Sequence, residues 1–295
     1  MTTIIGMTWK ELLRKRVLLL TLFMTLVFLL AFWFVAQTLG ERLNRLGAAD
    51  RNSISYLMET YQIGAVTLSL GFFFGSFVIA FLSIFSSFSV IAGEAEQGVL
   101  QALLPRPIAR WQWYLGRWVG YVGFGVSYAA FLFTAILLIT KYHSGMSLDA
   151  VSLMKSFALF AFVVPMLVSM TMLGSCIFSA IGNGVFMTML FGAGWLGGMI
   201  EKVTSAMPAE QSTTLKPLHL IAGLMSLAMP ADSIQQRMLA EMFSLSDIQS
   251  LVNLNNIAGP LGLGQVPSNA FLVYASCYTL AALAAGLVLF RKKDF

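Results

Sequence analysis

The chain alternates between long apolar runs and short polar clusters. After the basic residues Arg14, Lys15 and Arg16, an apolar run extends from Val17 to Leu39. Further long uncharged stretches follow, at Thr60–Gly93, Trp118–Thr140, Ser156–Ile200 and Ala270–Phe290. A helix needs about 20 apolar residues to cross the hydrocarbon core of a bilayer. Each of these runs is therefore long enough to span a membrane.

The stretch Ser156–Ile200 is too long for one span, because 45 residues in a single helix would extend about 67 Å. We place its break at Gly182-Asn183-Gly184, whose residue types favour a tight turn. The pattern then predicts an all-α membrane protein with a single transmembrane domain over residues 1–295. Its six transmembrane helices are expected at approximately 17–39, 63–92, 118–140, 157–181, 184–200 and 270–290.

Two segments outside the spans carry helical patterns of their own. In the first sixteen residues, Ile5, Trp9, Leu12 and Leu13 share one helical face, which predicts an amphipathic helix lying on the membrane surface. Residues 201–269 form the predicted extracytoplasmic or interfacial segment.

Within that segment, Leu218 to Met229 is apolar but too short to cross a bilayer. We interpret it as an interfacial helix, and a re-entrant element is the alternative. After Pro230, Asp232 or Ser233 is suited to cap a second helix. The residues expected on one face of this second helix are Ile234, Met238, Leu239 and Met242.

The composition agrees with a membrane protein and predicts its orientation. Hydrophobic residues make up 58% of the chain and charged residues 11%, less than half of the roughly 25% typical of soluble domains. With the N-terminus inside, the inner segments hold ten of the eighteen basic residues but four of the thirteen acidic ones. The positive-inside rule then places both termini in the cytoplasm and the protein in the cell (inner or cytoplasmic) membrane. The net charge of +5 is explained in this way without nucleic acid.

No constellation typical of an active site occurs in the sequence. His143 and His219 fall in predicted outer loops and are interpreted as solvated loop residues, and Cys176 and Cys277 are predicted to be buried free thiols. The zinc-protease, serine-hydrolase and P-loop motifs are missing. Because the predicted spans contain no charged residue, transport driven by a buried acid is disfavoured. We expect no catalytic residue, metal site or cofactor in this chain, and an energy source in a partner.

The most informative polar interval joins the second and third predicted spans, from Glu94 to Arg110. Glu94 and Glu96 lie near the expected start of a helix, where carboxylates are favoured. The apolar ridge of this helix consists of Leu100, Leu103 and Leu104, and Pro105 and Pro107 end it. Such a helix is suited to dock into a groove of a cytosolic protein. The alternative is an ordinary basic loop that only fixes topology.

This interval resembles the permease subunit of type-2 ATP-binding-cassette exporters. The matching residues are Glu94, Gly98, Leu103, Leu104, Pro107, Ile108, Arg110 and Gly116. Val99, where the family usually has Thr, and Arg117, in place of Lys, depart from the pattern. Trp9-Lys10-Glu11-Leu12 is similar to the family's elbow helix.

The resemblance implies a homo- or heterodimer of permeases bound to two cytosolic ATPases, which would hold ATP and Mg²⁺. It also implies that the interval is the coupling helix seated on the ATPase. The residues expected to couple are Glu94, Glu96, Gly98, Leu103, Leu104, Pro107 and Arg110. An ATP-independent transporter and a membrane assembly or immunity protein are the alternative functions.

Small residues in the spans complete the prediction. A hydroxyl stripe in span two is expected either to line the translocation path or to bond a neighbouring helix, and its members are Ser69, Ser76, Ser83 and Ser87. Three pairs have Gly-x-x-x-Gly spacing and predict close helix packing: Gly71/Gly75, Gly116/Gly120 and Gly194/Gly198. Hydroxyl and apolar linings favour a lipid-like, peptide or hydrophobic substrate for export.

Overall fold

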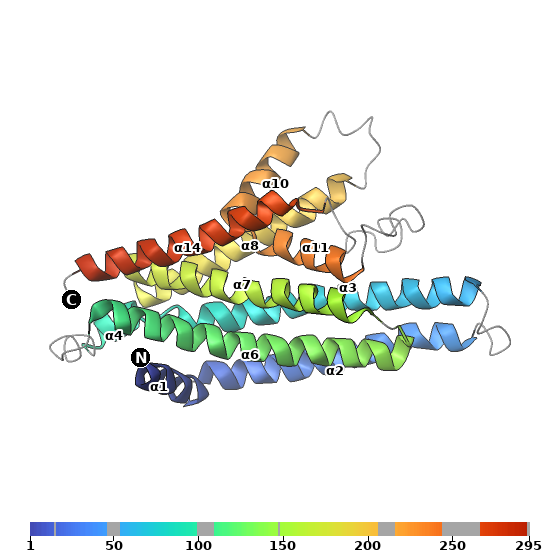
Figure 1. The fold of residues 1–295 in the computed structure, drawn as a ribbon, viewed down its shortest axis with the longest axis horizontal. Helices are drawn as coiled ribbons and strands as arrows, with labels where there is room; N and C mark the ends of the chain where they lie inside the picture. Colours follow the sequence, from blue (N-terminus) through green and yellow to red (C-terminus); the bar gives the residue numbers. More distant parts are fainter. Residues whose placement is uncertain are drawn as a thin grey trace.

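The computed structural model describes residues 1–14, 16–45, 54–98, 109–146, 148–205, 216–243 and 266–293. Regular structure in these residues is entirely helical (Figure 1). The helices are α1 (Thr2–Arg14), α2 (Arg16–Arg45), α3 (Ile54–Ser87), α4 (Ala92–Glu96), α6 (Arg110–Ser144), α7 (Ala150–Ile177), α8 (Ala180–Ser205), α10 (Lys216–Ala228), α11 (Ala231–Met242) and α14 (Asn269–Lys292).

Six of the described segments are long and apolar enough to cross a membrane, which confirms the predicted fold class. They are Leu18–Glu41, Met58–Glu96, Arg110–Ser144, Ala150–Ile177, Ala180–Thr204 and Asn269–Lys292. Figure 1 shows the long helices side by side, with both chain termini and α4 at one end of the bundle. We call this the N/C end and the other the opposite end. α10 and α11 lie toward the opposite end.

The core of the bundle lies where α3, α6 and α7 meet. Phe72 of α3 stands 5.1 Å from Phe133 of α6 and 5.3 Å from Phe160 of α7 between ring centroids, and the last two rings are 5.7 Å apart. All three side chains are buried. α3 also packs against α2, α8 and α11, and α7 against α8, α11 and α14, so these two helices form the centre of the bundle. α2 and α14 bury the smallest share of their apolar spans.

The three glycine pairs are contact points between helices, as predicted. A Cβ at Gly71 would lie 2.7 Å from the Phe32 ring of α2, and one at Gly194 would lie 2.6 Å from the Met229 carbonyl oxygen. Gly116 and Gly120 of α6 receive side chains of α1 in the same way. These glycines let the helices approach more closely than any side chain would permit.

α1 has two different faces. Thr8 and Leu12 are buried, and Ile4 and Thr8 fit against the glycines of α6. Trp9 and Leu13, which belong to the predicted apolar face, are exposed. The helix therefore packs on the bundle through one stripe and leaves a second apolar stripe uncovered.

α10 and α11 form a hairpin that enters the bundle from the opposite end. Gly194, which contacts Met229 at the hairpin's turn, lies roughly 16 Å along α8 from Ser205 at its end. The carbonyl oxygens of Leu227 and Ala228 accept hydrogen bonds from Tyr274 and Tyr278 of α14, at 2.8 and 2.7 Å. Helix-end carbonyls inside a bilayer need such partners. The hairpin is thus bonded to α14 and packed against α8, and the interfacial and re-entrant interpretations both remain predictions.

The turn between α7 and α8 lies at Phe178 and Ser179, one helical turn before the predicted Gly182-Asn183-Gly184 break. Ser179 accounts for the difference, because its hydroxyl accepts a hydrogen bond from the Gly182 N–H at 3.3 Å and serines are favoured at helix starts. The predicted turn residues instead lie in the first turns of α8. There, Asn183 donates to the Phe88 and Thr171 carbonyls at 2.8 and 2.9 Å.

Other predictions need correction as well. His143 lies in the last turn of α6 and His219 within α10, so neither is a loop residue. Cys176 is buried, but Cys277 is exposed. α8 continues past residue 200, so its last turns carry Glu201 and Lys202 and the span is not free of charge.

Candidate functional site

At the N/C end, the chain reverses between α3 and α6 around the short helix α4. The first amide groups of this corner are buried, and Ser175 of α7 accepts from the Ile91 and Ala92 N–H groups at 3.1 and 3.0 Å. Asn183 of α8 binds the Phe88 carbonyl at the end of α3. Side chains of α7 and α8 thus provide hydrogen-bond partners for backbone groups that the chain reversal leaves without a helical partner. These bonds fix where α4 begins.

Arg117, near the start of α6, joins α1 to α4. Its guanidinium donates to a carboxylate oxygen of Glu11 on α1 and to one of Glu94 on α4, and it lies 5.4 Å from the Trp113 ring centroid. The side chains of Arg117 and Glu94 are 10% and 14% exposed, so water screens this pair little. Removing one partner of a buried ion pair costs about 3–5 kcal/mol. Arg117 is therefore a strong link between the three helices.

Two more charged side chains attach the flanks of residues 99–108 to helix ends. On one side, Glu96 Oε1 accepts from the Ala180 N–H at the start of α8, at 3.1 Å. On the other, Arg110 Nη1 donates to the Arg291 and Lys293 carbonyls at the end of α14, both at 3.0 Å. An anion at a helix start and a cation at a helix end are both favoured by the helix dipole.

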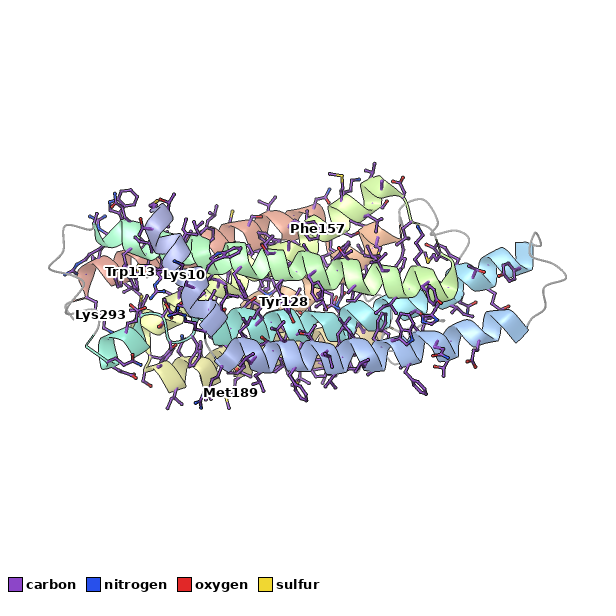
Figure 2. The ribbon with its side chains drawn as sticks, turned by 90° about the horizontal axis from the view of Figure 1, so that it is seen from below. Lys10, Trp113, Tyr128, Phe157, Met189 and Lys293 are labelled. Carbon is purple, nitrogen blue, oxygen red and sulfur yellow. The ribbon has the colours of Figure 1, made fainter. Side chains whose placement is uncertain are left out.

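Figure 2 shows Trp113 of α6, Lys10 of α1 and Lys293 at the end of α14 gathered at the N/C end, far from Phe157. The ammonium of Lys293 also donates to the Cys176 carbonyl at the end of α7, at 2.9 Å. Direct polar contacts at this end therefore join α1, α4, α6, α7, α8 and α14. A displacement of residues 92–110 would act on all of them.

A second polar cluster is buried at the α10–α11 hairpin. Lys202 of α8 pairs with Asp232 of α11 at 3.2 Å, and their side chains are 6% and 3% exposed. The other carboxylate oxygen of Asp232 accepts from Gln236 at 2.7 Å, and Gln235 donates to the Phe72 carbonyl of α3 at 3.0 Å. These bonds fasten α11 to α8 and α3, so the hairpin is part of the bundle rather than a loose loop.

The comparison with protein families decides the class of the molecule. A family model described as "ABC-2 family transporter protein" matches residues 3–295. The chain belongs to the ABC-2 transporter family. Comparison with curated proteins gives no match. The protein is thus a permease subunit of an ABC transporter, a membrane transport component that associates with ABC ATPases.

The structure of the ABC-2 permease describes part of the predicted coupling interval. Glu94 and Glu96 lie in α4, which ends there instead of continuing toward the prolines. Gly98 has φ 71°, a left-handed conformation that glycine adopts without strain. Leu103, Leu104 and Pro107 lie outside the described residues.

The serine stripe of the permease faces into the protomer. Ser69, Ser83 and Ser87 are buried, and Ser76 borders a cavity of about 10 Å³ next to Asp232. The Ser76 and Ser87 hydroxyls donate to carbonyls of their own helix, α3, at 2.8 and 2.7 Å. Each of these two hydroxyls therefore has its hydrogen-bond acceptor within α3.

Sequence reasoning missed several residues that build this end of the permease. Arg117 entered only as a departure from the family pattern, and Glu11 only as an amphipathic-helix residue. A cation at the start of a long apolar run is nevertheless a usable signal, because it needs an anionic partner when buried. Ser175 and Asn183 gave no such signal, since a hydroxyl or an amide in a span has many possible partners.

Proposed function

We propose that the N/C end faces the cytosol and that residues 92–110 couple this permease to a separate ATPase. The observation that carries the proposal is the attachment of both flanks of residues 99–108, through Glu96 to α8 and through Arg110 to α14. A loop that served only topology would need positive charge, but no contacts to two distant helix ends.

In this proposal the ATPases supply the work and the permease redirects it. ATP and Mg²⁺ bind in the ATPases, and their closure displaces the coupling segment. Arg117 passes the displacement to α1, whose uncovered apolar stripe lies on the membrane surface as an elbow helix. Glu96 passes it to α8, and Arg110 to α14. Two permeases, identical or homologous, would then rearrange around a path between them.

We further infer that the substrate is lipid-like, a peptide or another hydrophobic compound, and that transport is export. Support comes from the large apolar surface of the described spans and from the lack of charge in their central portions. A multivalent ion would need charged partners at this depth. The Lys202–Asp232 pair does not supply them, because its two charges already bind each other.

Single cysteines would test the location of the coupling site. In a Cys277→Ser background, Gln97→Cys and Ala109→Cys place thiols at exposed positions flanking residues 99–108, and Val266→Cys is the matched position at the opposite end. In intact cells, an impermeant maleimide should label the thiol at 266 and spare the thiols at 97 and 109, with the reverse pattern in inside-out vesicles. Labelling of 97 and 109 from outside would disprove the orientation.

Coupling itself is tested with the complete complex of permease and ATPase in proteoliposomes. Glu96→Ala and Arg110→Ala remove the acceptor and the donor of these two links, so they should leave the ATPase bound but lower ATP-driven transport at least severalfold. Glu241→Gln, at an ion pair near the opposite end, is the control and should transport normally. Undiminished transport by both coupling variants, or transport without ATP, would contradict the proposal.

A further inference from the structure

An apolar groove of about 410 Å³ runs between α2 and α3. From α2 it is lined by Leu20, Met24 and Phe28, and from α3 mainly by phenylalanines, among them Phe77, Phe81 and Phe85. Thr21 also lines it, but its hydroxyl already donates to the Leu18 carbonyl at 2.9 Å. The groove thus presents aliphatic and aromatic side chains to a ligand, and the Thr21 hydroxyl proton is already used within α2.

The groove has a defined length and direction. Toward the opposite end, α2 and α3 are in close contact where Phe32 packs on Gly71. From this contact toward the N/C end, the groove follows α2 from Phe28 to Leu20, a distance of roughly 12 Å. That is close to the thickness of one leaflet, since the whole hydrocarbon core is about 30 Å thick. One acyl chain of the leaflet at the N/C end therefore matches the groove in length.

The end of the groove nearest the N/C end carries positive charge. Arg16, the first residue of α2, lies one helical turn before Leu20 on neighbouring positions of the same side. Arg14, two residues earlier, ends α1, and both arginines are exposed. A guanidinium at this depth is placed to bind a phosphate group at the membrane surface.

We propose that the α2–α3 groove is a binding site for an anionic phospholipid of the leaflet at the N/C end, with an acyl chain along the phenylalanines and its phosphate at Arg16. The site does not depend on the coupling segment. Loss of lipid binding would leave the proposed ATPase coupling intact, and the reverse also holds.

A second groove provides an internal comparison. It has a volume of about 440 Å³ and lies on the other side of α2, against α6. Its lining includes Leu26, Leu29 and Phe131 and reaches Trp33, so it extends toward the opposite end and away from Arg16. Annular lipid should fill it according to exposure alone, without preference for headgroup charge.

Photolabelling of the full-length permease distinguishes the two grooves. The protein is reconstituted in phosphatidylcholine vesicles containing a trace of phosphatidylglycerol or phosphatidylcholine with a photoactivatable acyl chain, and labelled residues are mapped by mass spectrometry. The phosphatidylglycerol probe should label the α2–α3 groove about fivefold more than the phosphatidylcholine probe, equivalent to about 1 kcal/mol for one basic residue at the surface. Both probes should label the α2–α6 groove equally.

Two pairs of variants make the test specific. Arg16→Gln should reduce the phosphatidylglycerol labelling of the α2–α3 groove to the phosphatidylcholine level. Met24→Trp, which fills that groove, should abolish labelling there with both probes, whereas Leu26→Trp, in the other groove, should not. Equal labelling by the two probes, or a charge preference that survives Arg16→Gln, would overturn the proposal. Unchanged elution and melting of each variant show that it is folded.

Discussion

The buried ion pair between Lys202 and Asp232 allows a quantitative prediction about how the α10–α11 hairpin is held. Asp232→Asn removes the negative charge but keeps an oxygen for Gln236, which donates to Asp232 at 2.7 Å. Lys202→Met removes the positive charge and keeps most of the apolar stem that passes the Phe73 ring, whose centroid is 5.9 Å from the ammonium. The double variant removes both charges with little change in volume.

The magnitude follows from burial. With side chains 6% and 3% exposed, neither charge is well solvated when its partner is lost, and breaking such a pair costs about 3–5 kcal/mol. Because the substituted side chains stay close in shape, we expect each single variant to lose about 3 kcal/mol in free energy of unfolding. The double variant should lose less than either single variant, since no uncompensated charge remains. The coupling energy between the two sites should therefore exceed about 2 kcal/mol.

The measurement is a double-mutant cycle of reversible unfolding in mixed micelles, followed by tryptophan fluorescence. Arg237 and Glu241 provide the control pair on the same helix, at 2.6 Å, with side chains 19% and 26% exposed. Glu241→Gln should cost less, about 1 kcal/mol or below, because this pair is only partly buried and lies one helical turn apart on one helix. If the costs of Asp232→Asn and Lys202→Met simply add in the double variant, the pair does not hold the hairpin and this reasoning is wrong.

Three further predictions concern single positions. Gly198→Ala should lower the free energy of unfolding by about 1–3 kcal/mol, because the new methyl group would occupy the space of the buried Asp232 carboxylate. Gly192→Ala on the same helix is the control. Its methyl group would meet no atom within 4 Å, so it should be neutral or slightly stabilising in the same unfolding assay. Arg117→Met should lower the melting temperature and uncouple ATP hydrolysis from transport in proteoliposomes, because two carboxylates lose their shared partner; normal coupling would show that this link is not needed. In detergent, a small maleimide should modify the exposed Cys277 rapidly and the buried Cys176 only after unfolding, which mass spectrometry of the peptides would check.

Features that depend on local pattern were predictable. The number of spans follows from the length of the apolar runs, because hydrocarbon admits few charges. The contact role of the glycine pairs follows from their spacing. In each case the property is set by residues within one helix.

Features that depend on which helices meet were not predictable. Asp232 or Ser233 was expected to cap α11, but Pro230 is the N-cap and both residues lie in the first turn. There the Asp232 carboxylate meets Lys202 of another helix. The turn before α8 was misplaced because Gly-Asn-Gly is a strong local turn signal, and the contacts of Asn183 with two distant carbonyls override it. In both cases a buried polar side chain takes the partner that the tertiary structure offers.

α8 connects the two polar clusters of the permease. Its first amide binds Glu96 of the proposed coupling site, and its other half carries Gly194, Gly198 and Lys202, which all contact the α10–α11 hairpin. An α-helix of this length, held together by its internal i to i−4 hydrogen bonds, moves largely as one body. If the ATPase displaces Glu96, the hairpin must therefore either move with α8 and exchange its contacts with α3, α7 and α14, or stay in place and exchange its contacts with α8. Because a hydrogen bond and an ion pair have few stable arrangements, such an exchange would be a switch between discrete states rather than a gradual deformation.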